Sequence, residues 1–291
     1  MNSDTMKWYH QLKGCHHVQK FESKEQEKHY YETQATEKDF LSWYAKQAQP
    51  KYEKPSVTVD NVLMSYNRQE DALKLLLIQR NTHPFRFAWA LPGGFVNPHE
   101  STADSCIRET KEETNVTISK QNIEQLHTFS TPHRDPRGWV ITVSYLAFIG
   151  EEPLTAGDDA KEAKWFHIER EGDLLHLTHP EHDSIILNLK TNSSVGPSTL
   201  AFDHEQIIIK AFNRVKNKMY HEPKVLHVLG ADFSITEARK VFAKFLGIPY
   251  RDIDHSNFKK ALLPYLEEIG ERPIGIGRPS KIYRLKQLNQ D

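Results

Sequence analysis

The chain has 291 residues, of which 38 are Lys or Arg and 39 are Asp or Glu, so its formal charge is −1. With 38% hydrophobic and 26% charged residues it can bury a core, which excludes a wholly disordered chain. No apolar run approaches the roughly 18 residues that span a bilayer. The polar start lacks a signal-peptide pattern, and two isolated cysteines exclude a disulfide framework. We therefore expect a soluble, cytoplasmic protein with no membrane partner.

The charge is unevenly distributed along the chain. Residues 201–291 hold 16 Lys and Arg against 11 Asp and Glu, a net of +5, so residues 1–200 carry −6. In a chain long enough for two domains, this asymmetry indicates two domains with different partners.

The N-terminal two thirds divide into an extension and a domain. Residues 1–52 are polar with little to bury, and we expect an extension that is partly helical or mobile. Residues 53–190 alternate between strand and helix patterns, which predicts an α/β or α+β domain with a mixed sheet between helices. The expected strands are 57–64, 72–79, 124–131, 139–148 and 163–168, and the expected helix is 101–114.

The C-terminal third has a different pattern. Residues 191–200 are rich in turn formers and predict a linker, followed by a domain over 201–291. Helices are expected from Asp203 to about 220, over 224–229, from a Ser234 cap to Gly247, and from Ser256. Pro264 shortens the last of these helices, and a hairpin follows it. This order predicts a winged helix-turn-helix.

The most specific chemical pattern is a row of carboxylates in the helix expected over 101–114. Glu109, Glu112 and Glu113 are spaced i, i+3 and i+4, so they converge on one helix face. Glu-rich faces are usually solvated surface. Three carboxylates this close repel one another unless a cation neutralises them, and Mg²⁺ or Mn²⁺ prefers oxygen ligands. Such an ion could bind a diphosphate and activate a water molecule.

The residues around this row resemble the signature of the Nudix hydrolases. Gly94, five residues, Glu100, seven residues, then Arg108, Glu109, Glu112, Glu113 and Val116 all match it. Thr110 replaces an aliphatic residue, and its hydroxyl needs a polar partner. Asn115 replaces a glycine, and Asn tolerates a left-handed helix end, so we expect the loop to survive.

The resemblance implies a role for each matching residue. Glu109, Glu112 and Glu113 would bind the metal, with Glu112 and Glu113 closest to catalysis. Glu100 would support the metal site, and Arg108 would orient a carboxylate. The reaction implied is hydrolysis of a nucleoside diphosphate linked to another group.

Two further segments offer groups that suit a nucleotide. Guanidiniums suit phosphates and aromatic rings suit adenine, and Arg80, Phe85, Arg86 and Trp89 precede the glycine pair Gly93 and Gly94. Arg134, Asp135 and Arg137 form either a polar turn with internal salt bridges or a ligand loop. Their similarity to a segment of Nudix proteins that act on or sense ADP-ribose favours a ligand loop.

A single glutamate and a group of three histidines follow later in the chain. Glu162 is a candidate base that could reach the diphosphate. His176, His179 and His182 have metal-like spacing, but Pro180 intervenes and no Cys accompanies them, so we expect a solvated loop there.

The C-terminal domain carries the basic residues. They lie on the last helix and in the hairpin, where they could form one face for DNA phosphates or, alternatively, for a protein. They are Lys259, Lys260, Arg272, Arg278, Lys281 and Arg284.

The segments Leu200-Ala-Phe-Asp-His204 and Gly277-Arg-Pro-Ser-Lys-Ile-Tyr-Arg284 resemble the NrtR regulators. In that family a Nudix domain senses ADP-ribose and a winged helix represses genes of NAD metabolism. The resemblance implies a double-stranded DNA operator. Because Pro264 makes the last helix short, Ser256, Asn257, Lys259 and Lys260 are the candidate groove and phosphate contacts, with Arg278 and Lys281 in the wing.

Two functions therefore remain open. One is a regulator that binds an ADP-ribose-like nucleotide and changes its DNA affinity. The other is a hydrolase of ADP-ribose pyrophosphatase type whose C-terminal domain serves dimerisation; a sensor without catalysis is a third variant. Because each acidic position of the signature is present, we expect hydrolysis. Palindromic operators are read by symmetric dimers, so we also expect a homodimer.

Overall fold

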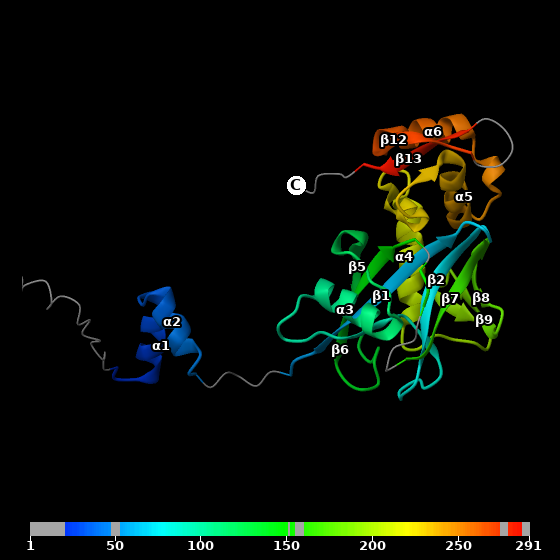
Figure 1. Cartoon of the computed structure of the whole chain (residues 1–291). Helices are drawn as coiled ribbons and strands as arrows, with labels where there is room; N and C mark the ends of the chain where they lie inside the picture. Colours follow the sequence, from blue (N-terminus) through cyan, green and yellow to red (C-terminus); the bar gives the residue numbers. More distant parts are fainter. Residues whose placement is uncertain (1–20, 48–52, 151, 155–159, 274–278, 287–291) are drawn as a thin grey trace, which may run out of the picture. The chain divides into compact units, whose positions relative to one another are not determined.

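The computed structural model describes residues 21–47, 53–150, 152–154, 160–273 and 279–286 (Figure 1). Arg278, which we expected to contact DNA, lies outside the described residues. The chain divides into two compact units, Met1–Glu53 and Lys54–Asp291. Within the described ranges, no helix is both long enough and apolar enough to cross a membrane.

The first unit is a pair of short helices. Helix α1 covers Lys24–Thr33 and helix α2 covers Glu37–Tyr44, within the extension that we expected to be partly helical. The rings of Tyr31 and Trp43 stack with centroids 5.0 Å apart, and the Trp43 indole N–H donates to Glu27 over 3.1 Å. Neither helix contains a buried residue, so aromatic contacts rather than a core hold this unit together.

The second unit contains the mixed α/β sheet that the sequence predicts. Ten strands form it in the described part of the chain, in the order β10-β9-β8-β7-β2-β1-β6-β5, with β3 beside β2 and β4 beside β1. Strand β1 runs parallel to β6 and antiparallel to β2 and β4. The strands are β1 Ser56–Asn67, β2 Ala72–Arg80, β3 Trp89–Ala90, β4 Gly93–Phe95, β5 Ile123–Phe129, β6 Val140–Phe148, β7 Ala160–Glu171, β8 Leu174–His179, β9 His182–Asn188 and β10 Ser193–Val195.

The central strands are buried on both faces, because a helix covers each side of the sheet. Val62 and Met64 of β1 share a core with helix α4, His204–Lys218. Leu63, between them, packs with Val116, which follows helix α3, Thr102–Thr114. Burial on both faces explains why β2 has an unbroken apolar run instead of an alternating pattern.

The histidine-containing segment is a hairpin, so the prediction of a solvated loop there was wrong. Strands β8 and β9 are joined by Pro180 and Glu181, and Leu175, Leu177, Ile185 and Leu187 of the two strands are buried. Pro180 fits the turn and does not interrupt either strand. Residues 191–200, the expected linker, contain β10, and Leu200 forms a bridge with Trp89 of β3.

The C-terminal part forms the predicted winged helix. A 3₁₀ helix η2 (Pro223–Leu229), helix α5 (Ile235–Leu246) and helix α6 (His255–Leu262) pack on a sheet of order β11-β13-β12. The strands are β11 Phe233–Ser234, β12 Leu266–Arg272 and β13 Ser280–Leu285, and short 3₁₀ helices η1, η3 and η4 cover Lys120–Asn122, Tyr250–Asp252 and Leu263–Tyr265.

The helix caps in this part follow the sequence closely, with one difference. Ser234 and Glu237 form a capping box at the start of α5, and Gly247 ends it in the left-handed conformation. Helix α6 is capped by Asp254 and begins at His255, not at Ser256, because the Asp254 carboxylate accepts from the Asn257 N–H over 2.7 Å.

The winged helix packs directly against the end of the large sheet (Figure 1). Arg170 of β7 donates to the Phe245 carbonyl of α5 over 2.7 Å, and Arg68, after β1, donates to the Leu229 carbonyl over 2.5 Å. Asp71 forms ion pairs with Lys240 and Lys244 of α5. Core residues of both parts belong to one cluster, so the sheet and the winged helix form a continuous packed body.

Candidate active site

Helix α3 carries the carboxylates. Both of its ends are capped, and its two differences from the Nudix signature fit the helix. Ser101 caps its start by accepting from the Asp104 N–H over 3.1 Å, and Asn115 ends it with φ of 61°. The buried Thr110 hydroxyl donates to the Cys106 carbonyl over 2.8 Å and accepts from Asn61 over 3.0 Å. Both departures from the Nudix signature therefore keep the helix and its turn intact.

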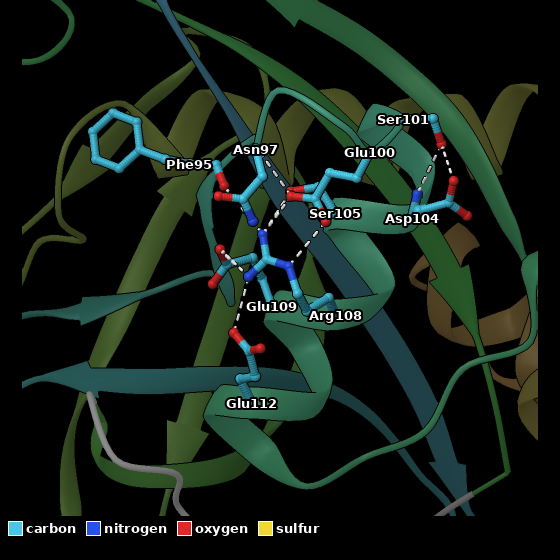
Figure 2. A network of polar contacts seen from close by, with 9 residues as sticks. All are labelled: Phe95, Asn97, Glu100, Ser101, Asp104, Ser105, Arg108, Glu109 and Glu112. Carbon is cyan, nitrogen blue, oxygen red and sulfur yellow. Dashed lines mark hydrogen bonds and ion pairs between the residues drawn. The ribbon is translucent and has the colours of Figure 1, made fainter.

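One guanidinium gathers three of the carboxylates (Figure 2). Arg108 donates to both oxygens of Glu100, over 3.0 and 2.6 Å, and through Nη1 to Glu109 over 2.7 Å and Glu112 over 2.9 Å. This contact, together with the Asn97 N–H, lowers the pKa of Glu100 to about 2. Arg108 thus neutralises part of the cluster and fixes its geometry.

The fourth carboxylate, Glu113, lies apart from Arg108. It accepts from the Gly93 N–H over 2.8 Å. Burial, together with the nearby carboxylates of Glu109 and Asp60, raises its pKa to about 8 against the effect of that N–H. Burial also raises the pKa of Glu109. Negative charge therefore exceeds positive charge in this cluster, because the single guanidinium of Arg108 contacts three carboxylates and leaves Glu113 without a cationic partner there.

Strand β4 presses its glycines against these acids. A Cβ atom on Gly94 would stand 2.5 Å from the Glu109 carboxylate, and one on Gly93 would stand 2.0 Å from the Val59 carbonyl oxygen. Only glycine leaves the backbone this close to the carboxylates. A cradle with carboxylate oxygen donors and an excess of negative charge fits a hard divalent cation.

A cavity opens beside the glycines. Of the predicted ligand residues, Arg80, Gly93, Gly94, Arg134, Asp135 and Arg137 line it, and Phe85 contacts its wall through the Phe202 ring, 4.8 Å away. The other lining residues are Thr58, Asp60, Ile78, Leu91, Phe95, Phe202 and His204.

Besides Phe85, three predicted ligand residues do not line this cavity. Trp89 is 8% exposed and packs in the core against Phe166, with ring centroids 4.8 Å apart. Arg86 donates to the Asn81 carbonyl. Glu162 of β7 lies 3.3 Å from His182 Nε2. Aromatic and charged residue types near the glycines did not reveal which side of the sheet each side chain occupies.

Cations and aromatic rings alternate along the cavity wall. The guanidinium of Arg80 lies 5.0 Å from the centre of the Phe202 ring, and that of Arg137 lies 5.0 Å from Phe95 and 5.3 Å from Phe202. Arg137 also forms a two-bonded ion pair with Asp135. The loop therefore has the internal salt bridge of a polar turn and also faces the cavity.

A buried polar cluster at the cavity was missed in the sequence analysis. His204 accepts from the Leu91 N–H through Nδ1 over 2.9 Å, and its Nε2 lies 3.2 Å from Asp60. The Thr142 hydroxyl donates to Asp60 over 2.6 Å. Burial opposes ionisation of Asp60, but His204, Thr142 and Arg134 outweigh it and lower its pKa. The signal available in the sequence was an acidic residue, Asp60, within the predicted strand 57–64, whose other residues include Val57, Val59, Val62, Leu63 and Met64.

The basic residues of the winged helix are largely paired with acids. Lys281 lies 2.7 Å from Glu268, Arg284 lies 2.9 Å from Glu267, and Arg272 lies 2.8 Å from Asp232. On α6, Ser256, Asn257 and Lys260 are exposed, and no described residue pairs with Lys260. Lys259 is partly buried, 6.0 Å from the Tyr283 ring. Among the described residues, exposed positive charge without an acidic partner therefore lies on α6 more than on the wing.

The motif, fold and cavity define a Nudix protein, and comparison with known proteins agrees. Residues 54–189 match the NUDIX domain model. The ADP-ribose pyrophosphatase of Methanocaldococcus jannaschii is 37% identical over 57% of this chain and 78% of its own length. The chain belongs to the Nudix family.

The C-terminal part narrows the assignment within that family. Residues 225–285 match the model described as the NrtR DNA-binding winged helix domain. The ADPR responsive transcriptional repressor NtrR of Acinetobacter baylyi is 28% identical over 88% of this chain and 91% of its own. A crystal structure of a MutT/nudix family protein from Enterococcus faecalis is 66% identical, with a TM-score of 0.87 over 92% of this chain and all of that one. The expected pairing of a Nudix domain with an NrtR winged helix is confirmed.

Proposed function

We propose that this protein binds and hydrolyses ADP-ribose, and that it regulates transcription of NAD-metabolism genes through its winged helix. The observation that carries the proposal is the joint presence of a complete carboxylate set around Gly93 and Gly94 and a cation-lined cavity beside it. The names of the two relatives, one an ADP-ribose pyrophosphatase and one an ADP-ribose-responsive repressor, support the ligand.

The carboxylates of α3 would hold Mg²⁺ or Mn²⁺. Glu109, Glu112 and Glu113 would be the ligands. Arg108, held by Glu100, positions Glu109 and Glu112 through the network of Figure 2, and the Gly93 N–H positions Glu113. When bound, the cation would supply charge neutralisation of the diphosphate and a more acidic water molecule.

The other residues of the cavity bind and orient the nucleotide. Arg80 donates through Nε to the Pro84 carbonyl, and its terminal nitrogens have no hydrogen-bond partner among the described residues, so they are available to the diphosphate. Arg137 lies beside the same ring as Arg80 and supplies a second guanidinium. The partly exposed rings of Phe85 and Phe202 offer stacking surface for adenine. Glu112 is 58% exposed, so water reaches it, and it accepts the proton that the attacking water releases.

The winged helix would bind an operator as a homodimer. The start of α6 presents Ser256 and Asn257 to the major groove, Lys259 and Lys260 contact phosphates, and Lys281 contacts the backbone from the wing. Symmetric binding to a palindromic site requires two copies, which light scattering of the purified protein would detect as a dimer.

The enzymatic part is tested by incubating the protein with Mg²⁺ and ADP-ribose. Hydrolysis of the diphosphate releases AMP and ribose 5-phosphate, which chromatography separates from the substrate. The double variant Glu112→Gln, Glu113→Gln should release no AMP. Wild-type protein that binds ADP-ribose without releasing AMP would instead support a sensor without catalysis.

The regulatory part is tested with DNA from upstream of NAD-biosynthesis genes. Binding should weaken as salt rises, exceed binding to unrelated DNA, and change with ADP-ribose. Equal affinity for any DNA, unaffected by nucleotide, would favour the second candidate, a hydrolase whose C-terminal domain serves dimerisation. The observation that favours this second candidate is the pairing of Lys281, Arg284 and Arg272 with acids, because it reduces the positive charge that the wing can offer to DNA.

A further inference from the structure

The cavity wall is completed by a segment that lies outside both family matches. Phe202 and His204 line the cavity, yet they follow the NUDIX match, which ends at residue 189, and precede the winged-helix match, which begins at 225. Backbone contacts hold this segment against the residues just before the glycines. The Ala201 N–H donates to the Trp89 carbonyl over 2.8 Å, and Leu200 bridges the same residue.

An ion pair ties Asp203, the residue just before α4, to the cavity. Arg134 lines the cavity, and it donates through Nε to Asp203 over 2.9 Å and through Nη2 to the other oxygen of the same carboxylate. Its Nη2 also lies 3.7 Å from Asp60. The Arg134 side chain is only 4% exposed. Asp203 stands at the N-cap position of α4 but makes no capping hydrogen bond, since its carboxylate is held by Arg134.

From this ion pair, α4 runs as one helix into the winged helix. The Phe212 ring lies 4.9 Å from Phe245 of α5. Tyr220, just after α4, lies 5.0 Å from Phe242 of α5 and 6.2 Å from Phe258 of α6. Phe212, Phe245, Phe242 and Phe258 are buried. Contiguous close packing of this kind transmits displacement of one element to the next.

We propose that the segment 200–204 belongs to the ligand site, and that Asp203 is a positioning residue that couples occupancy of the cavity to α4 and hence to α6. Phosphate oxygens form bidentate contacts with guanidinium as carboxylates do. The anionic group of the ligand therefore competes with Asp203 for Arg134, releases the carboxylate at the start of α4, and lets the helix reposition. This inference rests on the proposed binding of ADP-ribose in the cavity.

The decisive variant is Asp203→Asn, with Glu205→Gln as the matched control. Glu205 lies in the same helical turn, loses the same charge, and contacts Ser194 instead of the cavity. ADP-ribose binding is measured by calorimetry in EDTA, which prevents turnover, and operator binding is measured with and without ADP-ribose.

Wild type and Glu205→Gln should show a change in operator affinity of roughly 5- to 150-fold on addition of ADP-ribose. Asp203→Asn should bind ADP-ribose several-fold more tightly, because the competitor for Arg134 is gone, and its operator affinity should be insensitive to ADP-ribose. A variant that was merely damaged would bind the ligand more weakly. Weaker or unchanged ADP-ribose binding, or coupling equal to wild type, would overturn the inference.

A second measurement needs no variant. Hydrogen exchange of wild type should change on addition of ADP-ribose at the first turn of α4 and in α6, and should stay constant in the β8–β9 hairpin. Unchanged exchange at both helices under saturating ligand would also overturn it. If wild type does not bind ADP-ribose at all, it is the proposed function that fails; binding without coupling through Asp203 defeats this inference alone.

Discussion

The carboxylate cluster of α3 and the wing of the C-terminal domain both bring opposite charges together, but in different proportions. In the cluster, one guanidinium serves Glu100, Glu109 and Glu112, while Glu113 stays apart with a raised pKa. In the wing, Lys281 and Arg284 of β13 each face one acid of β12. The cluster keeps an excess of negative charge that a cation can neutralise, whereas these two cations of the wing are already neutralised by acids.

The comparison shows that a net charge does not locate a binding surface. The net charge of +5 on residues 201–291 does not mark the wing, where Lys281 and Arg284 pair with acids, whereas the exposed Lys260 of α6 has no acidic partner among the described residues. In contrast, the spacing of the acids on one helix fixes their mutual distance, so the sequence alone identifies that cluster.

The largest expected effect comes from removing the isolated acid. Glu113→Gln should lower the rate of AMP release from ADP-ribose by on the order of 10²- to 10⁴-fold, since it removes a carboxylate central to the site. Glu171→Gln, on an 88% exposed carboxylate, is the control and should keep full activity. Equal rates for Glu113→Gln and wild type would show that the excess charge of the cluster has no catalytic use.

Adding a methyl group at either glycine of β4 should have a smaller effect on activity. Gly94→Ala places a methyl group against the Glu109 carboxylate and should reduce activity by about 10²-fold through misplacement of that acid. Gly93→Ala instead meets backbone at Val59 and should destabilise the fold by about 1–3 kcal/mol. Activity assays and thermal unfolding of both variants separate the two effects; similar results for both would contradict this division.

The buried acid Asp60 should reveal itself through pH. Its pKa is lowered in the folded state, so its contribution is fully present above the ordinary value of 3.8 and is lost as pH falls through the folded value. Asp60→Asn should therefore cost about 1–3 kcal/mol of unfolding free energy at pH 7. The difference in unfolding free energy between Asp60→Asn and wild type should narrow towards pH 3. Urea unfolding at both pH values measures it, and a gap that widens in acid would contradict the account.

The smallest expected effects distinguish free from paired cations. Lys260→Ala should reduce the salt slope of operator binding by about 1, the value for one lost phosphate contact. Lys281→Ala should change it less, because Glu268 already neutralises that ammonium, and Glu268→Gln should steepen it. Filter binding across a salt series gives all three slopes. Equal losses for Lys260→Ala and Lys281→Ala would show that the pair in the wing opens on DNA.

Local signals in the sequence predicted the helices, most of their caps and the clustering of carboxylates on α3. The Ser234 cap, the Gly247 terminus and the left-handed Asn115 are set by neighbouring residues. The Asp60–His204 contact joins residues far apart in the chain, so no local pattern contains it. Likewise the pairing of Lys281 with Glu268 depends on the register of β12 with β13, which composition does not encode.

The most direct test of the account is a titration of operator DNA with wild-type protein, in EDTA, with and without saturating ADP-ribose. If ligand binding in the cavity is coupled to DNA binding by the winged helix, operator affinity should change by roughly 5- to 150-fold, while binding to unrelated DNA stays the same. Operator affinity that is identical with and without bound ADP-ribose would contradict it.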